Sequence, residues 1–297
     1  VLTHAEDGIV RCLSNVCTHR GTLVVEGEGH LQTLRCRYHG RRFDLNGCFR
    51  FMPEFDEAEG FPSKDDDLPG IALRQWGPLH FASLDPICEF EEWIAPERER
   101  LDWLRPERWT RFEAHTSDYL IPANWAMYCD NYLEGFHVPY VHAGSLGAKL
   151  DYEEYHTELF DWCSLQLGVA KDGQPAFDLP AGHPDEGKRI AAWYFWLFPN
   201  VMLNVYTWGV SVNMVQPLGP QRTRVLFRSY VPDPEKVGDA PGADLHRVEM
   251  EDGEIVESAQ RGMRSRLYDR GRYSPKREKG PHHFHVLLAR ALAGEKP

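Results

Sequence analysis

The pattern of apolar and polar residues changes twice along the 297-residue chain. Residues 1–88 hold short apolar runs, such as HLQTLRCRYHG and PLHFASLD, between glycine-rich turns, which predicts short strands. Residues 89–112 are dense in charge and contain two prolines, which indicates a helical linker. We therefore expect two domains, residues 1–100 and residues 101–297.

Beyond the linker, helical and strand patterns alternate. The segment ANWAMYCDNYLEGFHVPYVHAG predicts a helix that runs up to Pro139. Residues 190–221 lack charge and are long enough for a bilayer span, but Pro199, Asn200 and many aromatic residues favour two buried strands joined by a Pro-Asn turn. Apolar spacing predicts a long helix over residues 252–268.

Composition narrows the classes of partner. Lys and Arg number 33 against 45 Asp and Glu, a net charge of -12, which argues against nucleic acid, and no segment favours a membrane. Seven cysteines are an odd number in a long chain, so free thiols or metal ligands are expected rather than a disulfide framework. No targeting segment is visible, and the chain begins at Val1 inside a strand-like pattern.

Two short pairs of metal-binding residues stand in the first domain. Cys17 and His19 flank one residue, and Cys36 and His39 flank two. Four such ligands suit a structural zinc ion, or a two-iron, two-sulfide cluster with thiolates on one iron and imidazoles on the other. The spacing leaves both open.

The strings around these pairs, CTHRG and CRYHGRRFDLNG, resemble the Rieske iron–sulfur motif. The resemblance implies a [2Fe-2S] cluster in which Cys17 and Cys36 bind the inner iron and His19 and His39 bind the outer one. We expect the other five cysteines to be packing residues or free thiols.

A second candidate site contains His137 and His142. Five residues separate these side chains by about 140° on one helix, and Pro139 disfavours helical geometry at Val138. We therefore expect the two histidines to straddle a helix end and converge, with Glu134 three residues before His137 on the same helical face. Two histidines and one carboxylate are the ligand set of a non-haem iron(II) site, with positions open for oxygen and substrate.

The string DNYLEGFHVPYVH resembles Rieske non-haem iron oxygenase α subunits, most closely the choline, glycine betaine and carnitine branch. The similarity runs from Cys17 to residues 282–289, and the family has further residues before Val1. It implies an α+β fold: an all-β Rieske domain, then a helix-grip α/β catalytic domain with an antiparallel sheet and a long C-terminal helix. It also implies Asp252 as third iron ligand, before or at the start of a late helix, with Glu251 and Glu254 as alternatives.

The resemblance further implies a homotrimer in which Glu134 bridges His39 and His137 across a subunit interface, and a polar Asn131 near the iron. No G-x-G-x-x-G fingerprint is present, so an NAD(P)H-dependent reductase, with or without a ferredoxin, is expected to supply electrons. We expect it to dock on a basic cluster near the Rieske motif, comprising Arg20, Arg35, Arg37, Arg41 and Arg42.

The expected function is a cytoplasmic terminal oxygenase that uses O2 and two electrons to hydroxylate or oxidatively demethylate a small organic substrate. Dihydroxylation of an aromatic ring or acid is one alternative, and a zinc-bound structural or electron-transfer module without oxygenase activity is another. Aromatic faces can hold a quaternary ammonium. Candidate pocket residues are Phe136, Tyr206 and Trp208, with Tyr194 and Trp196 as further cage residues.

Overall fold

The computed structural model describes residues 1–234 and 242–295. Its contacts divide the chain into two compact units, Val1–Glu89 and Phe90–Pro297. The charged segment forms helices α1 (Phe90–Trp93) and α2 (Ala95–Leu101) at the start of the second unit, whereas the sequence placed the boundary between residues 100 and 101.

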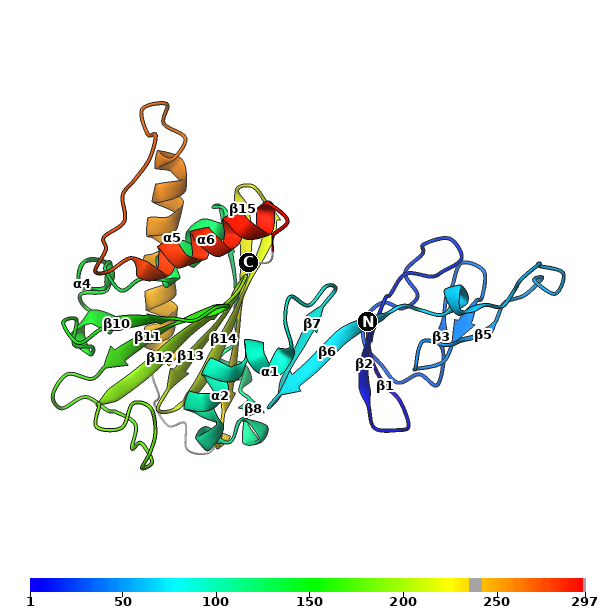
Figure 1. Ribbon diagram of the computed structural model, residues 1–297, viewed down its shortest axis with the longest axis horizontal. Coiled ribbons are helices and arrows are strands. Elements are labelled where there is room, and N and C mark those ends of the chain that lie inside the picture. Colours follow the sequence, from blue (N-terminus) through cyan, green and yellow to red (C-terminus); the bar gives the residue numbers. More distant parts are fainter. Residues whose placement is uncertain (235–241, 296–297) are drawn as a thin grey trace. The chain divides into compact units, whose positions relative to one another are not determined.

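The first unit consists of short antiparallel strands (Figure 1). One sheet has the order β1 (Leu2–His4), β2 (Val10–Leu13), β6 (Gly70–Trp76), β7 (Leu79–Ser83). The other has β3 (Leu34–Arg35), β4 (Arg42–Phe43) and β5 (Phe49–Phe51). The strand expected over HLQTLRCRYHG is thus only two residues long, because its second half turns back from Cys36 to Arg41.

The second unit contains an eight-stranded antiparallel sheet. Its order is β10 (His156–Leu159), β11 (Cys163–Val169), β12 (Ile190–Leu197), β13 (Val201–Tyr206), β14 (Gly209–Gly219), β15 (Arg222–Val231), then β8 (Thr110–Arg111), with β9 (Ser117–Ile121) also pairing with β15. The uncharged stretch forms three strands, not the two expected. Tyr206 pairs with Gly209, so Thr207 and Trp208 form a tight turn that the apolar pattern conceals.

Four helices complete this unit: α3 (Trp125–Tyr132), α4 (Val138–Val141), α5 (Gly242–Gly262) and α6 (Lys279–Leu292). Figure 1 shows α5 as the long helix beside the fanned strands β10 to β15. Helix α3 packs against α5, α6 and β14. Buried Cys129, Trp196 and Phe284 belong to the core that these elements share, which fixes α3 against the sheet.

Two helix predictions need correction. The helix expected to run up to Pro139 ends at Tyr132, and a short helix restarts at Val138. Helix α5 begins at Gly242 and ends at Gly262, so Asp252 lies in its middle rather than at its start. In the sequence, Gly253 and the acidic residues beside it look like the start of a helix. In the structure the helix continues through them, because α5 packs against α3. Among the described residues, no helix has both the length and the apolar character needed to cross a membrane.

Candidate metal centres

His137 and His142 lie at either end of a single helical turn. Helix α4 has His137 as its N-cap and His142 as its C-cap, and Pro139 occupies its first turn, where a missing N–H costs nothing. The rings are 5.1 Å apart between centroids. The prediction that these histidines straddle a helix end and converge is confirmed, although the helix is α4 rather than the end of a longer one.

Glu134 determines how the chain enters this turn. Its carboxylate accepts hydrogen bonds from the backbone N–H groups of Phe136 and His137, the latter at 3.1 Å, and contacts His137 Nδ1 at 2.7 Å. A Cβ on Gly135 would lie 2.4 Å from the Tyr155 ring, so only glycine allows this close approach. The chain therefore leaves helix α3 before Glu134, and the carboxylate reaches His137 by folding back.

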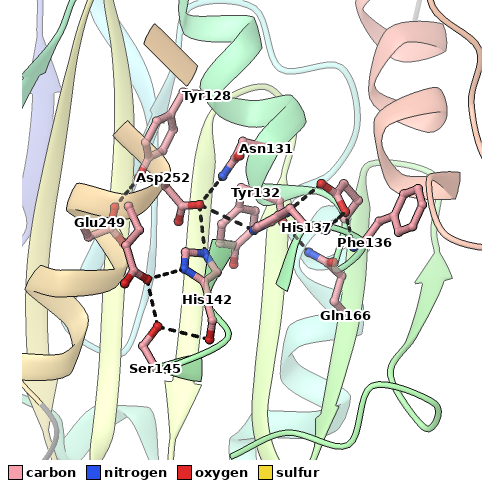
Figure 2. A network of polar contacts seen from close by, with 12 residues as sticks. Tyr128, Asn131, Tyr132, Phe136, His137, His142, Ser145, Gln166, Glu249 and Asp252 are labelled. Carbon is pink, nitrogen blue, oxygen red and sulfur yellow. Dashed lines mark hydrogen bonds and ion pairs between the residues drawn. The ribbon is translucent and has the colours of Figure 1, made fainter. Parts of the chain in front are cut away.

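Asp252 faces both histidines from helix α5. Its Oδ1 lies 3.0 Å from His142 Nε2 and 3.5 Å from His137 Nε2 (Figure 2). One possible ligand atom from each of the three residues lies within 4.8 Å of the other two. The structure thus brings together the two histidines and the carboxylate that the sequence put forward as iron ligands.

Each histidine is held by a second carboxylate on its other ring nitrogen. His137 Nδ1 contacts Glu134, and His142 Nδ1 contacts Glu251 at 2.8 Å. Such partners fix the tautomer of a ligating histidine and aim its free nitrogen at the metal. Both Nε2 atoms consequently point towards Asp252, which is the donor arrangement that a divalent iron ion requires.

The alternative ligands Glu251 and Glu254 lie elsewhere. Glu251 accepts from buried Ser145 at 2.9 Å and from Arg247 at 2.9 Å, on the Nδ1 side of His142. Glu254 is exposed on helix α5. Asn131 donates to Asp252 Oδ1 at 2.7 Å, so this amide restrains the carboxylate that faces the histidines.

The charges of this cluster reflect its burial. Desolvation opposes protonation of His142, but its hydrogen bonds to Asp252 and Glu251 outweigh that effect and raise its pKa. Burial by itself would raise the pKa of Glu251. Hydrogen bonds with His142, Ser145 and Arg247 outweigh burial, so the pKa of Glu251 is lowered. A metal cation would replace the proton that the surrounding carboxylates favour on His142.

The cysteine–histidine pairs of the first unit also converge. Buried Cys17 and Cys36 share one core, and the rings of His19 and His39 are 4.8 Å apart between centroids. Burial raises the pKa of the Cys17 thiol, and the adjacent Cys36 adds to the rise. Two buried thiols and two neighbouring imidazoles fit the donor set of a Rieske cluster.

Glycines shape the two loops that carry these ligands. Gly21 donates its N–H to Cys17 O at 2.9 Å, and Gly40 donates to Cys36 O at 3.0 Å. Both glycines have positive φ, 72° and 76°, a conformation that other residues rarely adopt. Each loop can therefore turn tightly enough to present its cysteine and histidine on the same side.

The basic cluster near the Rieske motif has four exposed members, not the five expected. Arg41 is 2% exposed, pairs with Asp66 at 2.5 Å, and lies over the rings of Phe49 and Phe61. Its guanidinium is used inside the unit, which removes it from any docking surface. The exposed arginines are Arg20, Arg35, Arg37 and Arg42.

The three candidate pocket residues are not gathered in one place. Phe136 is 40% exposed and points away from the histidines in Figure 2. Tyr206 stacks on Trp208 with ring centroids 5.4 Å apart. Of the further cage residues, Tyr194 contacts Tyr206 edge to face at 5.9 Å, whereas Trp196 packs in the core against Phe284.

A cavity that sequence reasoning missed lies beside the beginning of α5. Its volume is about 290 Å³, and its lining comes from the short 3-10 helix Glu113–His115 and from β9, β14, β15 and α5. Tyr119, Phe227 and Glu249 belong to this lining. Glu249 precedes Asp252 by three residues, so helical spacing would have identified it if the start of α5 had been predicted correctly.

Comparisons with known proteins agree with this architecture. The family "Ring hydroxylating alpha subunit (catalytic domain)" matches residues 106–294, and "Rieske [2Fe-2S] domain" matches residues 1–62. Chloroplastic choline monooxygenase from Arabidopsis thaliana is 32% identical, covering 97% of this chain and 70% of the relative. The carnitine monooxygenase oxygenase subunit of Escherichia coli strain K12 is 29% identical, covering 98% and 80%.

Solved structures show the same fold. The quaternary ammonium Rieske monooxygenase CntA in complex with L-carnitine has a TM-score of 0.74 at 23% identity, covering 97% of this chain and 80% of that chain. Naphthalene 1,2-dioxygenase from Rhodococcus sp. has a TM-score of 0.75 at 21% identity, covering 100% and 84%. The chain spans 64% of the Beta vulgaris choline monooxygenase that it matches at 30% identity.

The chain belongs to the Rieske-type ring-hydroxylating oxygenase α subunits. Membership confirms the α+β fold class, with a Rieske domain followed by the catalytic domain. It also confirms the expected class of enzyme, an oxidoreductase that acts with O2, and the two expected cofactors, a [2Fe-2S] cluster and a mononuclear non-haem iron.

Proposed function

We propose that this chain is the terminal oxygenase component that hydroxylates or oxidatively demethylates a small quaternary ammonium compound. The convergence of His137, His142 and Asp252 supports the oxygenase site, since two imidazoles and one carboxylate leave coordination positions open. The relatives named for choline and carnitine support the substrate class.

In this proposal the mononuclear iron, when bound, supplies the binding and reduction of O2. His137, His142 and Asp252 would hold it. Glu134 and Glu251 contact the Nδ1 atoms of the two histidines and so leave each Nε2 free for the metal. Asn131 restrains the Asp252 carboxylate. Cys17, His19, Cys36 and His39 hold the cluster that carries electrons.

Electron delivery involves further predictions. We expect Glu134 of one subunit to reach His39 of a neighbouring subunit in a trimer, as the family resemblance implies. Its contact with His137 Nδ1 at 2.7 Å supports this expectation. A reductase, with or without a ferredoxin, supplies the electrons, and Arg20, Arg35, Arg37 and Arg42 are its expected docking residues. The cytoplasmic location stays a prediction.

Metal analysis tests the ligand assignment. We expect Asp252→Ala to lose the mononuclear iron while the reduced-cluster EPR signal and the sulfide content are retained. Glu254→Ala, an exposed carboxylate on the same helix, is the matched control and should retain both metals. A colourless preparation containing only zinc after anaerobic reconstitution would contradict the whole assignment.

Substrate-dependent oxygen uptake tests the reaction. With NAD(P)H and a reductase, choline, glycine betaine or carnitine should stimulate uptake with a matching yield of hydroxylated or demethylated product. Product formation from aromatic compounds alone, as a cis-diol, would instead establish the ring-dihydroxylating alternative.

A further inference from the structure

The cavity beside α5 contains the carboxylate of Glu249, and the imidazoles of His115 and His246 also belong to its lining. Glu249 lines this cavity from the first turns of α5 and is half-buried. In the described parts of the chain, its hydrogen bond comes from the Tyr128 hydroxyl at 2.7 Å, and no lysine or arginine pairs with it. A carboxylate removed from water is unfavourable unless a cation or several donors compensate it.

The surroundings of Glu249 are aromatic. Tyr119 and Phe227 line the same cavity and pack edge to face, 5.3 Å apart between centroids. Burial raises the pKa of the Tyr119, Tyr132 and Tyr206 hydroxyls, and the charge of Glu249 contributes to each rise, so all three lie within its electrostatic reach. Aromatic faces beside a desolvated carboxylate favour a cation and exclude an anion.

The carboxylate also lies close to the iron ligands. Glu249 and Asp252 are one turn apart on α5, a spacing that places their Cβ atoms about 5–6 Å from each other. Burial and the charge of Asp252 raise the pKa of Glu249 to about 8, so the group is largely protonated at neutral pH when no cation lies beside it. A bound quaternary ammonium would favour the ionised carboxylate and so lower this pKa. A cation held by Glu249 would thus lie about one helical turn from Asp252, a proposed iron ligand.

We propose that Glu249 is the anionic contact for the quaternary ammonium group of the substrate, which occupies the cavity between α5 and strands β9, β14 and β15. Tyr119 and Phe227 supply the aromatic walls of this subsite. The inference rests on the proposed function, because it names the residue that would select a cationic substrate at that site.

The test compares a cation with its neutral isostere. Choline and 3,3-dimethylbutan-1-ol differ in one atom, nitrogen against carbon, and so in charge at nearly constant shape. Their affinities for the anaerobic holoprotein are measured by isothermal titration calorimetry. We expect Glu249→Gln to weaken choline binding at least about tenfold while the affinity for the alcohol changes less than about twofold. Glu249→Asp should restore part of the preference, and Glu254→Gln is the control on the exposed face of α5.

Each outcome is decisive. An equal loss of affinity for choline and for the alcohol in Glu249→Gln would overturn the inference. It would show that Glu249 affects the shape of the cavity and does not distinguish a charged ligand from a neutral one. A wild-type protein that prefers choline, together with a variant that keeps the preference, would leave the proposed substrate class intact and refute the role of Glu249. No preference for choline in the wild-type protein would refute the substrate class itself.

Discussion

At the scale of single residues, the orientation of two imidazoles is the feature on which the catalytic centre depends. His142 is 1% exposed and held at Nδ1 by Glu251, which Ser145 and Arg247 hold in turn. This chain of contacts leaves Nε2 as the nitrogen available to a metal ion. The iron site therefore depends on residues that do not touch the iron.

Removing the partner of His142 should weaken iron binding. We expect Glu251→Ala to lower the affinity for Fe(II) about 10–100-fold, because the imidazole loses the hydrogen bond that fixes its tautomer and angle. Competition with a chelator of known affinity measures this loss, and Glu254→Ala provides the control. An unchanged iron affinity would show that packing alone orients His142.

Glu134 provides a second prediction at this scale. Glu134→Gln keeps a similar shape, so both metals should remain bound, but turnover should fall at least about tenfold because the charge beside His137 is lost. Steady-state oxygen uptake and the rate of cluster reoxidation measure the effect, with exposed Glu154→Gln as the control. Near-normal coupled activity in the Gln variant would rule out the bridging role.

At the scale of elements, the break between α3 and α4 positions the site. Gly135 lies against the Tyr155 ring, and an added Cβ would come within 2.4 Å of it. We expect Gly135→Ala to lower the melting temperature and to reduce iron content, since the ring or the loop must shift. Gly253→Ala in α5 meets no atom within 4 Å and should instead stabilise the helix by about 0.5–1 kcal/mol. Thermal unfolding followed by circular dichroism, with iron content, distinguishes the two.

At the scale of the whole molecule, a buried carboxylate, Glu97, affects how the free energy of unfolding depends on pH. The net charge of -12 does not reveal this effect, because it counts all carboxylates alike. Glu97 is fully buried, and burial raises its pKa from 4.5 to about 8. Between pH 4.5 and about pH 8, Glu97 is therefore protonated in the folded state and ionised in the unfolded state. Stability from this group is present below pH 4.5 and is lost as the pH rises towards 8.

Glu97→Gln should remove that dependence. The variant is expected to unfold at a higher temperature than the wild-type protein at pH 8, with a smaller difference at pH 5. Exposed Glu99→Gln on the same helix should show neither change. A wild-type melting temperature that rises from pH 5 to pH 8 relative to the Gln variant would contradict the sign of this effect.

The sequence by itself determined which metal-binding side chains this protein carries and which local turns present them. Cys17, His19, Cys36 and His39 stand in loops whose spacing and glycines are local properties, so the cluster motif is visible without a fold. The same holds for His137 and His142, whose separation across Pro139 implied a helix end. Ligand type and local turn geometry depend on neighbours in the chain, which a sequence displays directly.

Only the tertiary structure decided which distant residues complete these sites. Arg41 looked like a surface residue until its pairing with Asp66 placed it inside the first unit. Glu251 stood as an alternative to Asp252, and the packing of α5 directs the two carboxylates to different nitrogens of His142. Glu249 drew no notice, because a carboxylate in an acidic helix becomes unusual only when a cavity and aromatic walls remove it from water. Burial and contacts between remote segments arise from packing, and no local pattern encodes them.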